Sequence, residues 1–113
     1  REPQVSAQAV KRLYTGAQDW KAFAHPLVVL LISKNLTGAP RIGVVAGRSI
    51  GGAVKRNRVK RQLRAVIQPL LVEIADGWDL IFLARPAISK SNSGEIQEAV
   101  FSLLHRAGLV DSR

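Results

Sequence analysis

Several residue types that build common protein sites are missing or scarce in this sequence of 113 residues. It contains no cysteine, which excludes disulfide bonds and thiolate metal sites. Only two histidines, His25 and His105, are present, so a histidine-rich zinc site is not expected. The longest apolar run, residues 26–32, has the length of a β-strand and falls well short of the roughly 20 residues that span a membrane. Length and composition predict one globular domain over residues 1–113.

Acidic residues are few and unevenly placed. Seventeen lysines and arginines stand against eight aspartates and glutamates, which gives a formal net charge of +9. No acid lies between Asp19 and Glu73, although this stretch contains ten basic residues. A uniformly solubilising surface would mix the two signs of charge. The separation therefore predicts a polyanionic partner, either nucleic acid or an anionic membrane, with a generic basic protein as the alternative.

Hydrophobic periodicity and turn residues predict a chain of mixed α and β structure. The expected helices are residues 6–14, 53–68 and 92–106, the last beginning with the capping-box pair Asn92 and Glu95. The expected strands are residues 25–33, 41–47 and 78–84, with an ambiguous further strand at 18–23. Residues 87–94 are expected to form a polar loop. This order predicts an α+β fold: an α/β sandwich with one mixed sheet of about four strands, three helices and a central β-helix-β crossover.

No side-chain pattern predicts an active site carried by the protein. Asp76 and Asp79 straddle a turn, and solvation explains them better than a paired-carboxylate site. His25 precedes a proline, and His105 falls in the last turn of a helix, where a cation suits the dipole. The glycine-rich residues 47–52 precede a helix, where anion binding and simple chain flexibility are equally good interpretations. We therefore expect no catalytic residue and no metal site in the protein.

The helix expected at residues 53–68 carries the strongest functional signal. Six of the ten residues from Lys55 to Arg64 are basic and none is acidic, while Val59 and Leu63 begin an apolar stripe on one side. Like charges four residues apart, such as Lys60 and Arg64, destabilise an isolated helix, so the cluster favours a role against a polyanion. Arginine predominates, which suits bidentate phosphate contacts. The alternative is a solvated charged face without a partner.

Within this helix, the sequence AVKRNRVKRQLR of residues 53–64 resembles the signature of the bacterial ribonuclease P protein subunit. The pattern of that family is roughly A-V-x-R-N-R-[IV]-K-R-x-x-R. Residues 41–44 (RIGV) are similar to the strand before the family's motif helix, and residues 78–85 resemble the hydrophobic strand after it. The resemblance covers most of the chain. It implies the family's fold, with a left-handed β-helix-β crossover around the basic helix.

The resemblance also implies a function. It points to the protein subunit of a cytoplasmic ribonucleoprotein endonuclease that removes the 5′ leader from precursor tRNA. Catalysis would belong to the RNA subunit, with Mg²⁺ held mainly by RNA. The implied partners are the catalytic RNA subunit and precursor tRNA, with no membrane and no small-molecule substrate. The alternative is a general basic RNA-binding or ribosomal protein without a role in tRNA processing.

Individual residues inherit expected roles from the resemblance. The residues expected to contact the RNA subunit are Arg48, Lys55, Arg56, Asn57, Arg58, Lys60, Arg61 and Arg64. A cleft between the first helix and the sheet would bind the leader through Val10, Lys11 and Tyr14. The family often has an aromatic residue where Val10 stands, so base stacking there should be weaker or come from elsewhere. Trp20 and Trp78 are interpreted as core or sheet-edge residues rather than stacking platforms.

Overall fold

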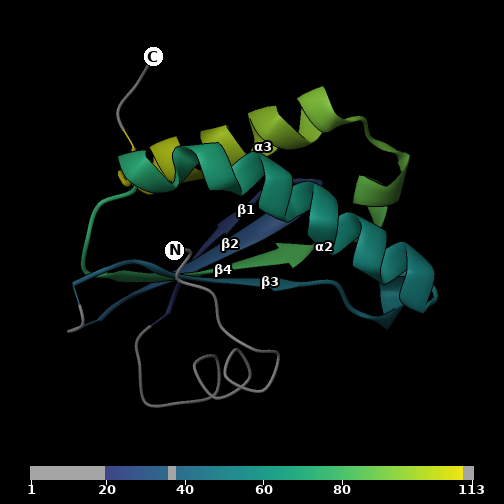
Figure 1. Cartoon of the computed structure of the whole chain (residues 1–113), viewed down its shortest axis with the longest axis horizontal. Coiled ribbons are helices and arrows are strands. Elements are labelled where there is room, and N and C mark those ends of the chain that lie inside the picture. Colours follow the sequence, from purple (N-terminus) through teal and green to yellow (C-terminus); the bar gives the residue numbers. More distant parts are fainter. Residues whose placement is uncertain (1–19, 36–37, 111–113) are drawn as a thin grey trace.

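The computed structural model describes residues 20–35 and 38–110, which form a four-stranded sheet with two α-helices against one of its faces (Figure 1). The strands are β1 (Lys21–Ala24), β2 (Val28–Lys34), β3 (Arg41–Val45) and β4 (Trp78–Ala84). The helices are α2 (Ala53–Ile67) and α3 (Ser93–Arg106), with short 3-10 helices η1 (Arg48–Ile50), η2 (Gln68–Glu73) and η3 (Pro86–Lys90). The expected α+β class is confirmed. The helix expected at residues 6–14 lies outside the described residues.

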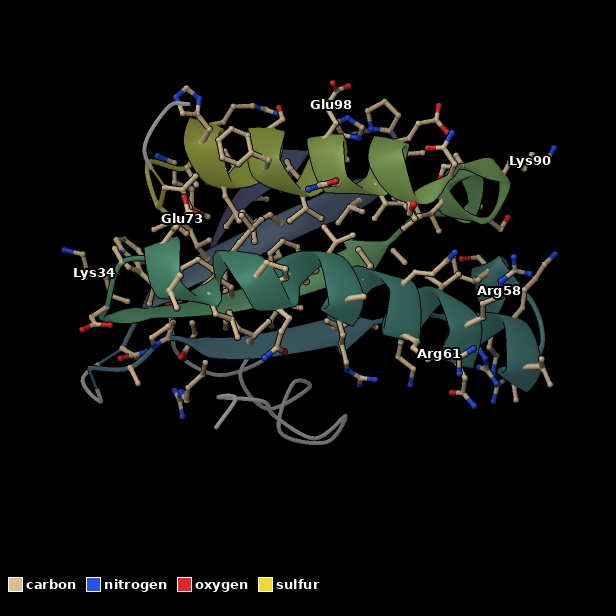
Figure 2. The ribbon with its side chains drawn as sticks, turned by 45° about the horizontal axis from the view of Figure 1, so that its top comes forward. Lys34, Arg58, Arg61, Glu73, Lys90 and Glu98 are labelled. Atoms are coloured by element: carbon tan, nitrogen blue, oxygen red, sulfur yellow. The ribbon has the colours of Figure 1, made fainter. Side chains whose placement is uncertain are left out.

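The sheet is mixed, with the strand order β1-β2-β4-β3. Strand β2 pairs antiparallel with both β1 and β4, whereas β3 and β4 are parallel. Parallel neighbours cannot be joined by a tight turn, so the chain crosses over through α2. Viewed from the helical side with β3 and β4 pointing upward, the step from β3 to β4 goes to the left (Figure 1, Figure 2). The crossover is therefore left-handed, against the usual rule for such units.

The sheet buries apolar side chains on both of its faces, but unequally. The main core lies between the sheet and the helices and includes Leu30, Phe82 and Leu63, all fully buried. A smaller cluster on the opposite face centres on Leu31 and Ile81. Because the central strands β2 and β4 bury side chains on both faces, their sequences are nearly continuous hydrophobic runs.

Helix α3 begins at the predicted capping box. The backbone N–H of Glu95 donates to Asn92 Oδ1 at 2.8 Å, and the backbone N–H of Asn92 donates to Glu95 Oε1 at 2.9 Å. Each bond satisfies an N–H group that the helix itself leaves unpaired. Within residues 20–35 and 38–110, no helix has the length and hydrophobicity needed to cross a lipid bilayer.

Two local predictions were wrong. The strand expected from residue 25 begins only at Val28, because the backbone N–H of Leu27 donates to His25 Nδ1 at 3.1 Å and closes a turn between β1 and β2. The polar loop expected at residues 87–94 contains η3, whose Ile88 is fully buried in the main core. A single apolar residue among polar neighbours has no periodicity, so the pattern could not reveal this anchor.

Asp79 is a further correction, because it is wholly buried in β4 rather than solvated at a turn. Arg41 of β3 donates to it twice, from Nε at 2.7 Å to Oδ1 and from a terminal guanidinium nitrogen at 2.6 Å to Oδ2. Asn35 Nδ2 also donates to Oδ1, at 2.9 Å. The hydrogen bonds to Asp79 raise the pKa of Arg41 above its usual range. This bidentate pair ties the two parallel strands together at the end where both begin.

Candidate nucleic-acid interface

Helix α2 separates an apolar side from a cationic side. Val59, Leu63 and Ile67 are spaced by four residues and are buried against the main core. The opposite side is exposed to solvent and carries Lys55, Asn57, Arg58, Arg61 and Arg64. Arg56 and Lys60 are half-buried at the borders between the two sides. The apolar stripe therefore fixes the orientation of the cationic side relative to the sheet.

The short helix η1 brings Arg48 to the same region, because η1 packs beside the start of α2. Arg48 is exposed. Between the two helices, Gly51 has a φ of +138°, and a Cβ there would lie 2.8 Å from Lys55 Cδ. Only glycine fits this tight connection. We call the exposed side of α2 together with Arg48 the basic face: Arg48, Lys55, Asn57, Arg58, Arg61 and Arg64.

Within the described residues, no carboxylate neutralises the basic face. The salt bridge found within the described residues joins Arg41 to Asp79 at the start of β3, whereas α2 follows the other end of that strand. Helix α2 begins at Gly52, which offers no side-chain cap, and its first turn contains no acid, so the positive end of the helix dipole adds to the field. Figure 2 shows Arg58 and Arg61 on α2 and Glu98 on the other helix. Such an uncompensated, arginine-rich surface attracts phosphates.

Two serines next to the basic face were not singled out from the sequence. Ser89 and Ser91 line a small notch of about 30 Å³ together with Lys55, Arg58 and Gln62. Both hydroxyls donate to backbone carbonyls of η3, Ser89 Oγ at 3.0 Å and Ser91 Oγ at 2.6 Å. Their contact with α2 depends on how η3 packs against that helix, so no local sequence pattern predicts it.

The predicted leader-binding residues Val10, Lys11 and Tyr14 lie outside the described residues. The structure describes the sheet face opposite the helices from strand β1 onward along the chain. Half-buried apolar side chains surround the Leu31 and Ile81 pair there: Trp20, Val29, Val45 and Leu83. This cluster is apolar, in contrast to the basic face of α2.

The part of the chain that the structure describes contains no cluster of side chains that could bind a metal ion. Residues 20–35 and 38–110 bring no three histidine, aspartate or glutamate side chains close enough to hold a metal ion. The buried carboxylate of Asp79 is engaged by Arg41 and Asn35. The side chains described here therefore do not fit Mg²⁺, and no step is assigned to a metal bound by them.

Comparison with known proteins gives one consistent result. The family described as Ribonuclease P matches residues 8–108. The chain is 36% identical over 108 residues to the ribonuclease P protein component of Herpetosiphon aurantiacus, covering 96% of this chain and 85% of that protein. It is 34% identical over 90 residues to the one from Clostridium botulinum, covering 79% and 81%.

Solved structures agree on the fold. The ribonuclease P protein of Staphylococcus aureus superposes with a TM-score of 0.80 at 21% identity, over 98% of this chain and all of that one. The protein from Thermotoga maritima superposes with a TM-score of 0.73 at 24% identity, over 88% and 91%. With the family match covering most of its length, the chain belongs to the ribonuclease P protein family.

Proposed function

We propose that this chain is the protein subunit of ribonuclease P, binds the catalytic RNA subunit through its basic face, and assists removal of the 5′ leader from precursor tRNA. The observation that carries the proposal is the basic face itself: the exposed side of α2 and Arg48 together present five lysines or arginines, with no carboxylate partner among the described residues. Membership of the family, whose relatives are described as protein components, supports an RNA subunit as the polyanion.

The role of the protein in this proposal is to position RNA. Catalysis belongs to the RNA subunit, and Mg²⁺ is held mainly by RNA. Arginines on α2 bind phosphates of the RNA subunit and lower their mutual repulsion, which reduces the Mg²⁺ concentration needed for activity. Contacts with the leader favour precursor over mature tRNA, which lets the product leave.

The test is cleavage of a precursor tRNA by a bacterial ribonuclease P RNA at a low concentration of Mg²⁺. Wild-type protein should restore cleavage, and the double variant Arg58→Ala, Arg61→Ala should not. The variant Lys21→Ala, Lys34→Ala removes the same charge from exposed positions on β1 and β2, away from the basic face, and should restore cleavage normally. Binding of the RNA without any stimulation of cleavage would favour the alternative, a general RNA-binding protein.

A further inference from the structure

The short helix η3 packs against α2 and η1 beside the basic face. Figure 2 shows Arg58 of α2 and Lys90 of η3 at the same end of the molecule. Between α2 and η3 lies the small notch of about 30 Å³, which we call the serine notch. The described residues that line it are Lys55, Arg58, Val59, Gln62, Ser89 and Ser91. A space of this size holds about one or two water-sized groups, so it can take a hydroxyl or a phosphate oxygen but not a nucleobase.

Hydrogen-bond donors form the α2 side of the serine notch. Lys55, Arg58 and Gln62 are spaced by three and four residues, so their side chains lie on one side of the helix. Lys55 and Arg58 are exposed members of the basic face, and Gln62 is half-buried. Among the described residues, none of these three side chains makes a hydrogen bond or an ion pair. Their N–H groups can therefore donate to a ligand.

Hydrogen-bond acceptors form the η3 side. Ile88 anchors η3 in the main core, and its carbonyl oxygen accepts both from the backbone N–H of Ser91, at 3.1 Å, and from the Ser91 hydroxyl, at 2.6 Å. The Ser89 hydroxyl donates to the carbonyl oxygen of Pro86 at 3.0 Å. Because a carbonyl oxygen only accepts, each serine has used its single hydroxyl hydrogen within η3. Each Oγ can still accept a hydrogen bond from a ligand but has no hydrogen left to donate.

The serine notch therefore fits a group that both donates and accepts and that stands next to a negative charge. A phosphate diester only accepts, so it suits the α2 side but not the serines. The ribose 2′-hydroxyl does both, and in an RNA strand it is adjacent to a phosphate. We propose that the serine notch binds one ribose 2′-hydroxyl of RNA, which donates to a serine Oγ while Lys55 and Arg58 bind the neighbouring phosphate.

This contact gives the basic face a means of distinguishing RNA from other polyanions. Cations alone attract any polyanion through charge. Deoxyribose lacks the 2′-hydroxyl, so DNA leaves the serine oxygens without a donor, and an acidic peptide offers them only further acceptors. The inference deepens the proposed function and rests on it, because RNA is taken as the ligand of the basic face. A short RNA hairpin is enough to test it.

The experiment compares two hairpins of one sequence, one made of ribonucleotides and one in which fluorine replaces every 2′-hydroxyl. Fluorine keeps the phosphates and the A-form backbone but removes the donor. Wild-type protein should bind the ribonucleotide hairpin about three- to tenfold more tightly, the effect of about one hydrogen bond. The variant Ser89→Ala, Ser91→Ala should reduce this preference to less than about twofold. The matched control, Ser49→Ala with Ser93→Ala, removes two exposed serines that are not among the lining residues and should keep the full preference.

The ratio of the two affinities separates binding from folding, because unfolded protein lowers both affinities equally. Three outcomes would overturn the serine notch: equal affinities of wild-type protein for the two hairpins, a preference that survives the loss of Ser89 and Ser91, or the same loss of preference in the control variant. If wild-type protein stimulates cleavage of precursor tRNA but shows no preference, the serine notch alone is refuted. If the preference depends on the two serines but cleavage is never stimulated, the proposed function alone is refuted.

Discussion

The salt bridge between Arg41 and Asp79 predicts different losses of stability when one or the other residue is replaced. Asp79 is fully buried, whereas the side chain of Arg41 is 36% exposed. Replacing Arg41 by methionine keeps the alkyl chain but leaves a buried carboxylate without its cation, which should cost about 3 kcal/mol, the low end for broken buried pairs. Replacing Asp79 by asparagine leaves an arginine that can turn toward water, so the cost should be about 1–2 kcal/mol.

The double variant Arg41→Met, Asp79→Asn separates the interaction from the cost of each change. With no stranded charge left, its cost should be close to that of Asp79→Asn alone, so the coupling free energy should be about 3 kcal/mol, the cost of Arg41→Met. The assay is urea unfolding of the four proteins, followed by circular dichroism. The double variant should be more stable than Arg41→Met, although it carries one more substitution.

Additive costs, with a coupling below about 0.5 kcal/mol, would refute this reasoning. So would a larger loss for Asp79→Asn than for Arg41→Met, because that would mean that the carboxylate is not the stranded group. A control pair is available in the capping box of α3, whose members Asn92 and Glu95 are exposed. Replacing Asn92 by alanine should cost only about 1 kcal/mol.

Three further predictions follow from the helix α2 and its connection. If about five cations of the basic face neutralise phosphates, the logarithm of the RNA association constant should fall against log salt with a slope of about −3.5 to −4.5, measured by filter binding; a slope near zero would contradict phosphate contacts. Leu63→Ala should lower the free energy of unfolding by about 2–5 kcal/mol in urea melts, since Leu63 is fully buried, with RNA affinity lowered only through the folded fraction. Gly51→Ala should cost about 1–3 kcal/mol, because φ is +138° and the new Cβ meets Lys55, whereas Gly47→Ala, where a Cβ meets nothing, should cost much less.

The elements that could be predicted from the sequence were those with clear local signals. Strand β4 was predicted with both ends correct, because Gly77 before it and Pro86 after it interrupt its hydrophobic run. Helix α2 was predicted to within one residue of its end, since its apolar stripe has a clear helical period. The capping box of α3 is confirmed in detail. These features depend on neighbours no more than a few residues away.

What could not be predicted depends on contacts between distant segments. Arg41 and Asp79 are 38 residues apart, and only the register of two parallel strands shows that they meet. The left-handed crossover was expected from the resemblance alone, because spacing and composition contain no information on handedness. The roles of the basic residues in RNA binding stay predictions.

Helix α2 meets two requirements that oppose one another. Its exposed side repels itself through like charges, and its first turn has neither an acid nor a side-chain cap, so the isolated segment would be a poor helix. Its stability therefore comes from burying Val59, Leu63 and Ile67 against the sheet. Adding acids to the exposed side would relieve the repulsion but would also neutralise the field that attracts phosphates. Because the core holds α2 in place, the chain can keep its cations close together on a rigid surface, which is what binding to the fixed phosphates of a folded RNA requires.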